Sequence, residues 1–270
     1  MNSTEYTKRL KTKLRIQEKT QNRNGVYGYT QRSMAYNSNR IEGSTLTERQ
    51  TASIFETGTL YLDKDVTLRN KDIEELTGHF KMFNYTLNHV DEPLSEEIIK
   101  TMHKCLKEGV FEDLANGFAV GDYKKIGNFV SDIKTALPQE VPERMKELLI
   151  DYHSKAEKTI DDIAQLHANF EKIHPFQDGN GRVGRMIVFK ECLANNIIPV
   201  IIRDDNKPKY MSKLHDAQVE GKLDGLVEFF EEEQKHYYDE TFYMVFDMDE
   251  IFEIEQKQNN TKEKNNDLEF

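Results

Sequence analysis

Residues 174–185 read HPFQDGNGRVGR, the densest run of chemically active side chains in the sequence. The segment contains an imidazole, a carboxylate, an asparagine between two glycines, and two arginines three positions apart. A proline disfavours a helical backbone at the residue before it, so Pro175 should end the preceding helix at His174. Apolar residues recur at helical spacing again from Val183 onward. The sequence therefore predicts a polar loop between two helices.

The glycines and arginines of this segment form the pattern of a phosphate site. Gly179 and Gly181 allow backbone conformations that turn successive N–H groups toward an anion at the N-terminus of the next helix. Arg182 and Arg185 lie on one side of that helix and add charged donors. Asp178 is the carboxylate in this positive setting, and a carboxylate beside phosphates usually holds Mg²⁺. The pattern predicts a site for a polyphosphate with Mg²⁺.

His174 stands at the edge of this predicted site. An imidazole there is placed to take a proton from an attacking hydroxyl, an effect worth about 10²- to 10⁴-fold in rate. Each residue taken alone has a simpler interpretation, as a helix cap, a turn or a surface ion pair. Their occurrence together within 174–185 favours the catalytic interpretation. Phe176 is predicted to anchor the loop in the core.

The same glycines also imitate a dinucleotide-binding fingerprint. Gly179, Gly181 and Gly184 satisfy G-x-G-x-x-G, and Asp204 follows about 20 residues later. That fingerprint must follow a buried strand, whereas residues 168–173 are polar and helical in pattern. The sequence therefore argues against a nicotinamide cofactor and keeps the phosphate chemistry.

Helical patterns dominate the rest of the chain. Thr45 with Glu48 three residues later predicts the start of a helix, and Gly58 its end. Apolar residues recur at helical spacing over residues 73–87, 98–106, 145–152, 160–173, 183–193, 208–219 and 223–238. Glycines and a proline interrupt residues 110–141, where a short β-hairpin is expected. The predicted fold class is all-α with one small hairpin.

Composition excludes several classes of protein. The 270 residues carry 37 Lys and Arg against 48 Asp and Glu, a net charge of −11. An acidic chain without a basic block is a poor ligand for nucleic acid or an anionic membrane, because both bind through clustered cations. The two cysteines are far apart, which favours a reduced, cytoplasmic protein. No apolar run approaches the roughly 20 residues of a membrane span, and residues 1–21 are polar, so we expect neither an anchor nor a secretory signal.

Residues 174–185 resemble the signature of the Fic family, H-P-F-x-[D/E]-G-N-G-R-x-x-R, at every fixed position. A weaker likeness extends over roughly residues 30–232. The resemblance implies a Fic-type helical bundle with a small β-hairpin flap. It also implies an enzyme that transfers AMP from ATP to a Tyr, Ser or Thr hydroxyl of a protein, with release of pyrophosphate.

The resemblance also implies a role for each residue of the signature. His174 would be the general base, and Asp178 would hold Mg²⁺. Gly179, Asn180 and Gly181 would hold the α- and β-phosphates, and Arg182 and Arg185 the outer phosphates. A phosphate-transferring branch of the family carries lysine at the position of Gly181, so the glycine favours adenylyl transfer.

A second match lies upstream. Ser38-Asn39-Arg40-Ile41-Glu42-Gly43 resembles the family's inhibitory motif, [S/T]-x-x-x-E-[G/N], in the form that precedes the catalytic core (class II). Ser38 and Glu42 are four positions apart and so share one face of a helix. The resemblance implies that Glu42 pairs with Arg185 in place of the outermost phosphate, so that bound ATP is misaligned and the enzyme is self-inhibited.

The expected hairpin resembles the family's target-binding flap, which pairs with the backbone of the target as an added strand. The flap would comprise Lys124, Lys125, Ile126, Gly127, Asn128, Phe129 and Val130. Ile126 and Phe129 have an alternative interpretation as core residues. Tyr210 and the apolar residues around Leu214 are expected to border the adenine.

The predicted organisation has five parts. They are a loosely attached polar extension (1–28), an inhibitory helix (29–43), the catalytic domain (44–238), a C-terminal helix (239–255) and a disordered polar tail (256–270). The expected partners are ATP and a protein target, the chain itself being one option. Homo-oligomerisation is left open, as are two alternative functions: removal of AMP at the same site with the help of Glu42, and a regulatory module that binds nucleotide without transfer.

Overall fold

The computed structural model describes residues 3–61, 67–128, 133–247 and 250. The described residues form α1 (Ser3–Lys19), α2 (Val26–Ile41), α3 (Glu48–Thr57), α4 (Asn70–Asn88), α5 (Glu96–Lys107), α6 (Phe111–Ala115), α7 (Val141–His153), α8 (Ile160–Ile173), α9 (Asn180–Ala194), α10 (Lys207–His215) and α11 (Asp224–Val245). A 3₁₀ turn (Asp204–Asn206, η1) and a π-helical turn (Asp216–Glu220, η2) flank α10. The all-α prediction is confirmed.

The expected hairpin is not seen in the part of its range that the structure describes. Residues 124–128 form no strand, and Phe129 and Val130 lie outside the described residues. The segment nevertheless lies against the signature loop, because the Lys124 N–H donates to the carbonyl oxygen of Pro175 at 2.9 Å. Its role as a flap stays a prediction.

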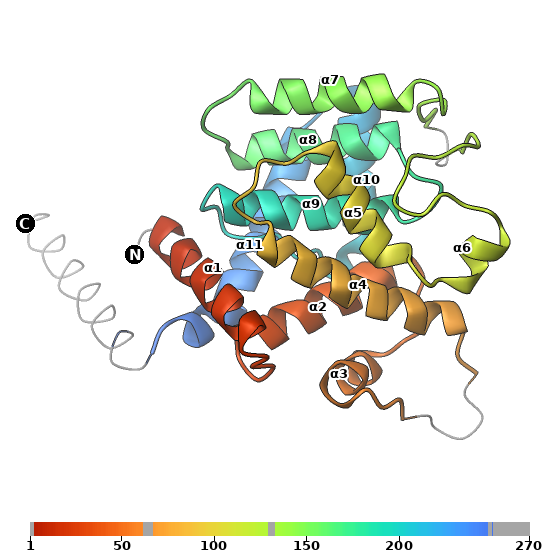
Figure 1. Ribbon diagram of the computed structural model, residues 1–270. Coiled ribbons are helices and arrows are strands. Elements are labelled where there is room, and N and C mark those ends of the chain that lie inside the picture. The colour runs from red at the N-terminus through yellow and green to blue at the C-terminus, as the bar shows by residue number, and fades with distance from the viewer. Residues whose placement is uncertain (1–2, 62–66, 129–132, 248–249, 251–270) are drawn as a thin grey trace, which may run out of the picture.

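Helix α9 is the centre of the bundle (Figure 1). It contacts α1, α2, α4, α5 and α8, and its residues from Arg182 to Leu193 are all buried. A helix covered on all sides must be apolar nearly all round, which the run from Met186 to Phe189 provides. The buried residues of α9 also include polar ones, so the helix holds Arg182 and Arg185, near its start, inside the protein.

The N-terminal segment is not loosely attached, contrary to the expectation from its polar composition. Helix α1 contacts α2, α4, α9 and α11, and Tyr6, Leu10 and Leu14 are fully buried in the main core. The Tyr6 hydroxyl forms a buried hydrogen bond with the Thr241 hydroxyl on α11. A few large apolar side chains along one face are enough to hold an otherwise polar helix.

Replacing Leu10 by alanine is expected to lower the free energy of unfolding by about 2–5 kcal/mol, because it leaves a cavity in the core. Urea denaturation measures the change. The matched control is Ile16→Ala on the same helix, where the side chain is 55% exposed, and a change within about 0.5 kcal/mol is expected. Equal losses for the two variants would show that α1 is not part of the core.

The helix boundaries differ from the sequence patterns at two places. Helix α3 begins two residues later than predicted, with a capping box of Thr47 and Gln50, while the Thr45 hydroxyl donates to Asp72 at 2.7 Å. Its predicted end at Gly58, in the left-handed conformation, is confirmed. Helix α11 runs through 238 and 239 without a break, so up to Val245 the expected C-terminal helix is the end of α11. The tail, 256–270, lies outside the described residues.

Within the described ranges, no helix combines the length and the apolar character needed to cross a membrane.

Candidate active site

His174 lies at the C-terminus of α8, where the chain turns sharply out of the helix. Its φ of 53° is in the left-handed region, and its N–H donates to the carbonyl oxygen of Phe170 at 2.9 Å. Pro175 follows and prevents the helix from continuing, as expected. Phe176 is fully buried, and its ring stacks on His103 with centroids 4.0 Å apart. The ring of Phe176 therefore fixes the loop in the core next to His174.

The surroundings of His174 keep its ring neutral and oriented. Nδ1 lies 3.3 Å from the carbonyl oxygen of Glu171, so a proton on Nδ1 is held there and Nε2 remains an acceptor. Burial lowers the pKa of His174 to about 4. At neutral pH the ring is therefore uncharged, with its proton on Nδ1 and none on Nε2, as a general base must be.

The N-terminus of α9 faces the same space. Gly179 precedes the helix with a φ of 84°, a conformation that favours glycine. The first N–H groups of any α-helix have no partner within the helix, so they can bind an anion. The Asn180 side chain, however, accepts from the Phe176 N–H at 2.8 Å and donates to the Phe176 carbonyl oxygen at 2.9 Å. The Asn180 side chain therefore holds the loop, and both ends of its amide are already bound to the Phe176 backbone.

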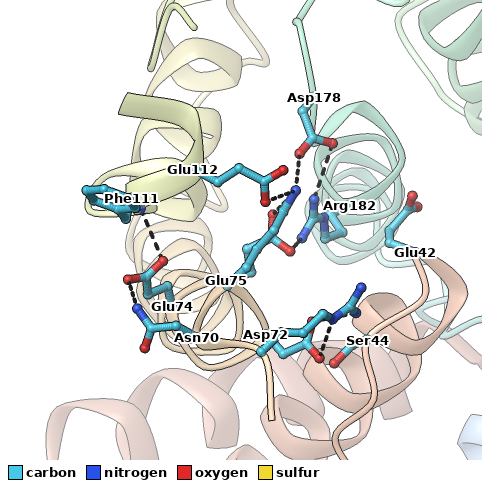
Figure 2. Close-up of a pocket in the computed structure, with 12 residues that line it drawn as sticks. Glu42, Ser44, Asn70, Asp72, Glu74, Glu75, Phe111, Glu112, Asp178 and Arg182 are labelled. Atoms are coloured by element: carbon cyan, nitrogen blue, oxygen red, sulfur yellow. Dashed lines mark hydrogen bonds and ion pairs between the residues drawn. The ribbon is translucent and has the colours of Figure 1, made fainter. Parts of the chain in front are cut away.

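Asp178 and Arg182 belong to a buried ionic network (Figure 2). Arg182 contacts Glu75 at 2.5 Å and Asp178 at 3.5 Å. The Lys107 ammonium, only 1% exposed, contacts Asp178 at 2.8 Å, Glu75 at 2.6 Å and Asp113 at 2.7 Å. Burial alone would raise the pKa of Asp178, but Arg182 and Lys107 outweigh it and hold that pKa below its usual range. Asp178 is thus a carboxylate anion in the structure.

Sequence reasoning missed Glu75 and Lys107. They lie on α4 and α5, about 70 to 100 residues before the signature, and each reads alone as an ordinary charged residue on a helix. Lys107 falls at a buried position near the end of α5, and Glu75 next to the buried Leu76 on α4. A charged side chain is rarely buried unless it is paired. A charged residue at a helix position that should be buried is therefore the signal that the sequence offers.

Arg185 contacts both residues of the upstream motif. Its Nε donates to the Ser38 hydroxyl at 2.9 Å, and its Nη2 donates to the Ser38 carbonyl oxygen at 3.0 Å and to Glu42 Oε1 at 2.7 Å. Glu42 follows directly after the last residue of α2 and is one third exposed. A Cβ atom at Gly181 would lie 2.4 Å from Glu42 Oε1, so the glycine makes room for this carboxylate. The structure therefore brings the two distant motifs into direct contact.

Two cavities border Glu42. One, of about 310 Å³, is lined by Glu42, Ile133, Glu171, His174, Gly181, Arg185, Tyr210, Met211, Leu214, His215 and Gln218. The other, of about 510 Å³, is lined mainly by charged residues of α4 and the signature, including Asp178 and Arg182 (Figure 2). Tyr210 and Leu214, which the sequence analysis expected to border the adenine, line the first cavity, and their role there stays a prediction. His174, Arg185 and the ring of Tyr210 line this single cavity.

The described part of the flap segment divides into buried and exposed residues. Lys124 is 2% exposed, and its ammonium donates to Asn128 Oδ1 at 2.5 Å and to the Thr135 hydroxyl at 3.2 Å. Lys125, Ile126 and Gly127 are exposed. Ile126, at 61% exposure, is therefore not a core residue.

Comparison with known proteins agrees with this geometry. Residues 93–191, which include the whole of 174–185, match the model of the Fic/DOC family. A protein adenylyltransferase Fic from Nematostella vectensis is 29% identical over 186 residues, which are 67% of this chain and 42% of the relative. A probable protein adenylyltransferase from Aquifex aeolicus is 29% identical over 185 residues, 58% of this chain and 56% of the relative. The chain thus spans about half the length of these relatives, or less.

Solved structures share the fold. A Fic domain containing signaling protein from Bacteroides thetaiotaomicron superposes with a TM-score of 0.70 at 22% identity, covering 90% of this chain and 97% of that one. Fic-1 from Caenorhabditis elegans gives a TM-score of 0.65 at 20% identity, covering 90% of this chain and 71% of that one. The helical bundle around the signature is that of Fic proteins, and this chain contains a Fic/DOC family domain.

Proposed function

We propose that this protein transfers AMP from ATP to a hydroxyl group of a protein. The observation that carries the proposal is the position of His174: a neutral imidazole lies on the wall of the same cavity as Arg185 and the start of α9. A regulatory module that only binds nucleotide needs the phosphate site but no base. The names of the relatives support the same reaction.

In the proposed reaction the hydroxyl oxygen of the target attacks the α-phosphorus of ATP. A new phosphorus–oxygen bond forms, the bond to the bridging oxygen of the β-phosphate breaks, and pyrophosphate leaves. His174 Nε2 takes the hydroxyl proton, while the N–H groups of Gly181 and its neighbours at the start of α9 bind the phosphates. Arg185 would hold the outermost phosphate. Because Gly181 stands where the phosphate-transferring branch has lysine, adenylyl transfer is favoured.

The donor set at Asp178 suits a magnesium ion that arrives with the nucleotide. The described residues contain no group of three or more His, Cys, Asp or Glu side chains placed to hold a metal alone. Mg²⁺ is usually held by one or two carboxylates together with substrate phosphates, and Asp178 is an anion at the edge of the phosphate site. When bound, the ion would neutralise phosphate charge and help orient the nucleotide. Lys107 would then share Asp178 with it.

We further propose that Glu42 holds the enzyme in an inhibited state. The carboxylate lies 2.7 Å from the guanidinium that would otherwise bind the outermost phosphate. Burial would raise the pKa of Glu42, but Arg185 and Arg182 lower it, so the inhibitory group is charged at neutral pH. ATP bound beside this carboxylate would have its α-phosphate out of line with the attacking hydroxyl, and an error of about 1 Å can cost about 10²-fold in rate.

Removal of AMP from a modified target is the second candidate. The observation in its favour is that Glu42 and His174 line the same cavity, where a carboxylate could orient a water molecule. Loss of label from a premodified target, faster with wild type than with a Glu42→Gly variant, would favour this reaction. An unchanged label would leave transfer as the only activity.

The proposed transfer is tested with ATP labelled at the α- or at the γ-phosphate. The Glu42→Gly variant is incubated with each nucleotide, Mg²⁺ and a cell lysate, and labelled proteins are separated and identified. Label from the α-position alone is expected, on a target or on the protein itself. Label from the γ-position would show phosphoryl transfer, and no label from either would contradict enzymatic transfer.

A further inference from the structure

Glu171 is a buried carboxyl group that the proposed mechanism does not yet use. It lies in the last turn of α8, three residues before His174, and its side chain is 8% exposed. Its Oε1 is buried and has no hydrogen-bond partner among the residues that the structure describes. A buried carboxyl oxygen without a hydrogen-bond partner costs free energy, which suggests that Glu171 has a functional role.

The carboxyl group lies beside the catalytic ring. Glu171 Oε2 is 4.0 Å from His174 Nδ1, on the side of the imidazole opposite to the atom that would take the substrate proton. Glu171 and His174 both line the cavity of about 310 Å³. The same residue therefore approaches Nδ1 twice, with its backbone carbonyl oxygen at 3.3 Å and with its carboxyl group.

Gly184 makes room for this carboxyl group. A Cβ atom at position 184 would lie 2.2 Å from Glu171 Oε1 and 3.1 Å from the ring of His167. Gly184 lies inside α9, where glycine is less favourable than alanine. The helix thus carries a destabilising residue at a position where any side chain would displace Glu171.

We propose that Glu171 is a positioning residue for His174. The Glu171 carboxylate stabilises the imidazolium that forms on His174 during the reaction. When Nε2 takes the proton of the target hydroxyl, the ring carries a positive charge and a proton on each nitrogen. A carboxylate beside Nδ1 then lowers the energy of that state, whereas a neutral carboxyl group does so far less. This inference rests on the proposed transfer, which assigns the base.

The charged groups around Glu171 couple it to Glu42. Burial raises the pKa of Glu171 to about 8, Arg185 on α9 lowers it, and Glu42 raises it. His167 on α8, its Nε2 bound to the Tyr210 hydroxyl, is kept neutral by burial. Removing Glu42 therefore lets Glu171 lose its proton at a lower pH.

The ring of His174 faces a second set of charges. Lys124 lowers its pKa, while Glu42 and Asp178 raise it, all by less than burial. None of these three groups lies on α8, and Lys124 and Asp178 are present in every variant of the test below, so their effects persist when Glu171 is replaced. A pH-dependent change at Nδ1 that disappears with the Glu171 carboxyl group can then be assigned to that group.

The test compares Glu42→Gly with the double variant Glu42→Gly/Glu171→Gln, with Glu42→Gly/Glu147→Gln as control because Glu147 on α7 is exposed. The Nδ1 resonance of His174 is followed by NMR from about pH 6 to about pH 9. In Glu42→Gly and in the control it should shift with the ionisation of Glu171, and with the glutamine only the smaller shift that Lys124 causes should remain, because burial lowers the pKa of Lys124 to about 8. The AMP-transfer rate should rise over the same range and be about tenfold lower and flat without the carboxylate.

The NMR arm does not depend on turnover, so it separates this inference from the proposed function. An Nδ1 shift that keeps its full size in Glu171→Gln, or that is absent from Glu42→Gly, would overturn the role of Glu171 even if AMP transfer is found. If the glutamine variant does not fold, Gly184→Ala in the Glu42→Gly background displaces the carboxyl group instead. It should weaken the same shift, and an unchanged shift would overturn the proposal.

Discussion

Replacing His174 by alanine in the Glu42→Gly background should lower the rate of AMP transfer by about 10²- to 10⁴-fold, the usual contribution of a general base. The structure gives the reason: the ring is neutral, its Nδ1 faces the Glu171 carbonyl oxygen, and Nε2 is free to accept a proton. The phosphate site does not include this side chain, so ATP should still bind. Initial rates with α-labelled ATP measure the first effect, and titration calorimetry the second.

The control for this variant is His236→Ala on α11, an imidazole away from the signature, which should transfer AMP at the rate of the parent. Transfer by His174→Ala within a few-fold of the parent would show that another group takes the proton. Loss of ATP binding together with transfer would assign His174 to the nucleotide site instead.

Replacing Glu42 by glycine should raise the rate of AMP transfer by about 10²-fold over wild type. The substitution removes the carboxylate that lies 2.7 Å from Arg185 and leaves the guanidinium to the outermost phosphate. The α-phosphate then aligns with the attacking hydroxyl, which reverses the misplacement that the carboxylate imposes. Labelling of the protein and of a lysate, wild type beside variant, measures the change.

Glu108→Gly is the matched control, because Glu108 is also a glutamate that directly follows a helix, at the end of α5, and is exposed. It should label as weakly as wild type. Equal labelling by wild type and Glu42→Gly would show that Glu42 does not inhibit transfer, even though its carboxylate contacts Arg185. Activation by both substitutions would point to loosening of the fold.

Local sequence rules anticipated the parts of the site that depend on neighbouring residues. Pro175 ends α8 at His174, and Phe176 anchors the loop, because both effects act within a few positions. The pairing of Glu42 with Arg185 was expected only through a family resemblance, since no spacing rule relates residues 143 positions apart. The structure brings these two residues into contact.

What the sequence could not indicate depends on tertiary packing. The polar composition of residues 1–28 favoured loose attachment, whereas Tyr6, Leu10 and Leu14 bury one face of α1 in the core. Asn180 was expected to face a phosphate, but its side-chain amide is taken up by the Phe176 backbone. Glu75 and Lys107 reach the signature only because α4 and α5 pack against α9. Each of these environments depends on which helix or loop packs against the residue, and the periodicity of a sequence does not contain that information.

The most direct test of the account is a crystal structure of the Glu42→Gly variant with a non-hydrolysable ATP analogue and Mg²⁺. The account predicts the outermost phosphate on Arg185 where the Glu42 carboxylate now lies, the α-phosphate at the start of α9 facing His174 Nε2, and the adenine beside Tyr210. A nucleotide whose phosphates lie away from Arg185, or whose α-phosphate is out of reach of His174, would contradict it.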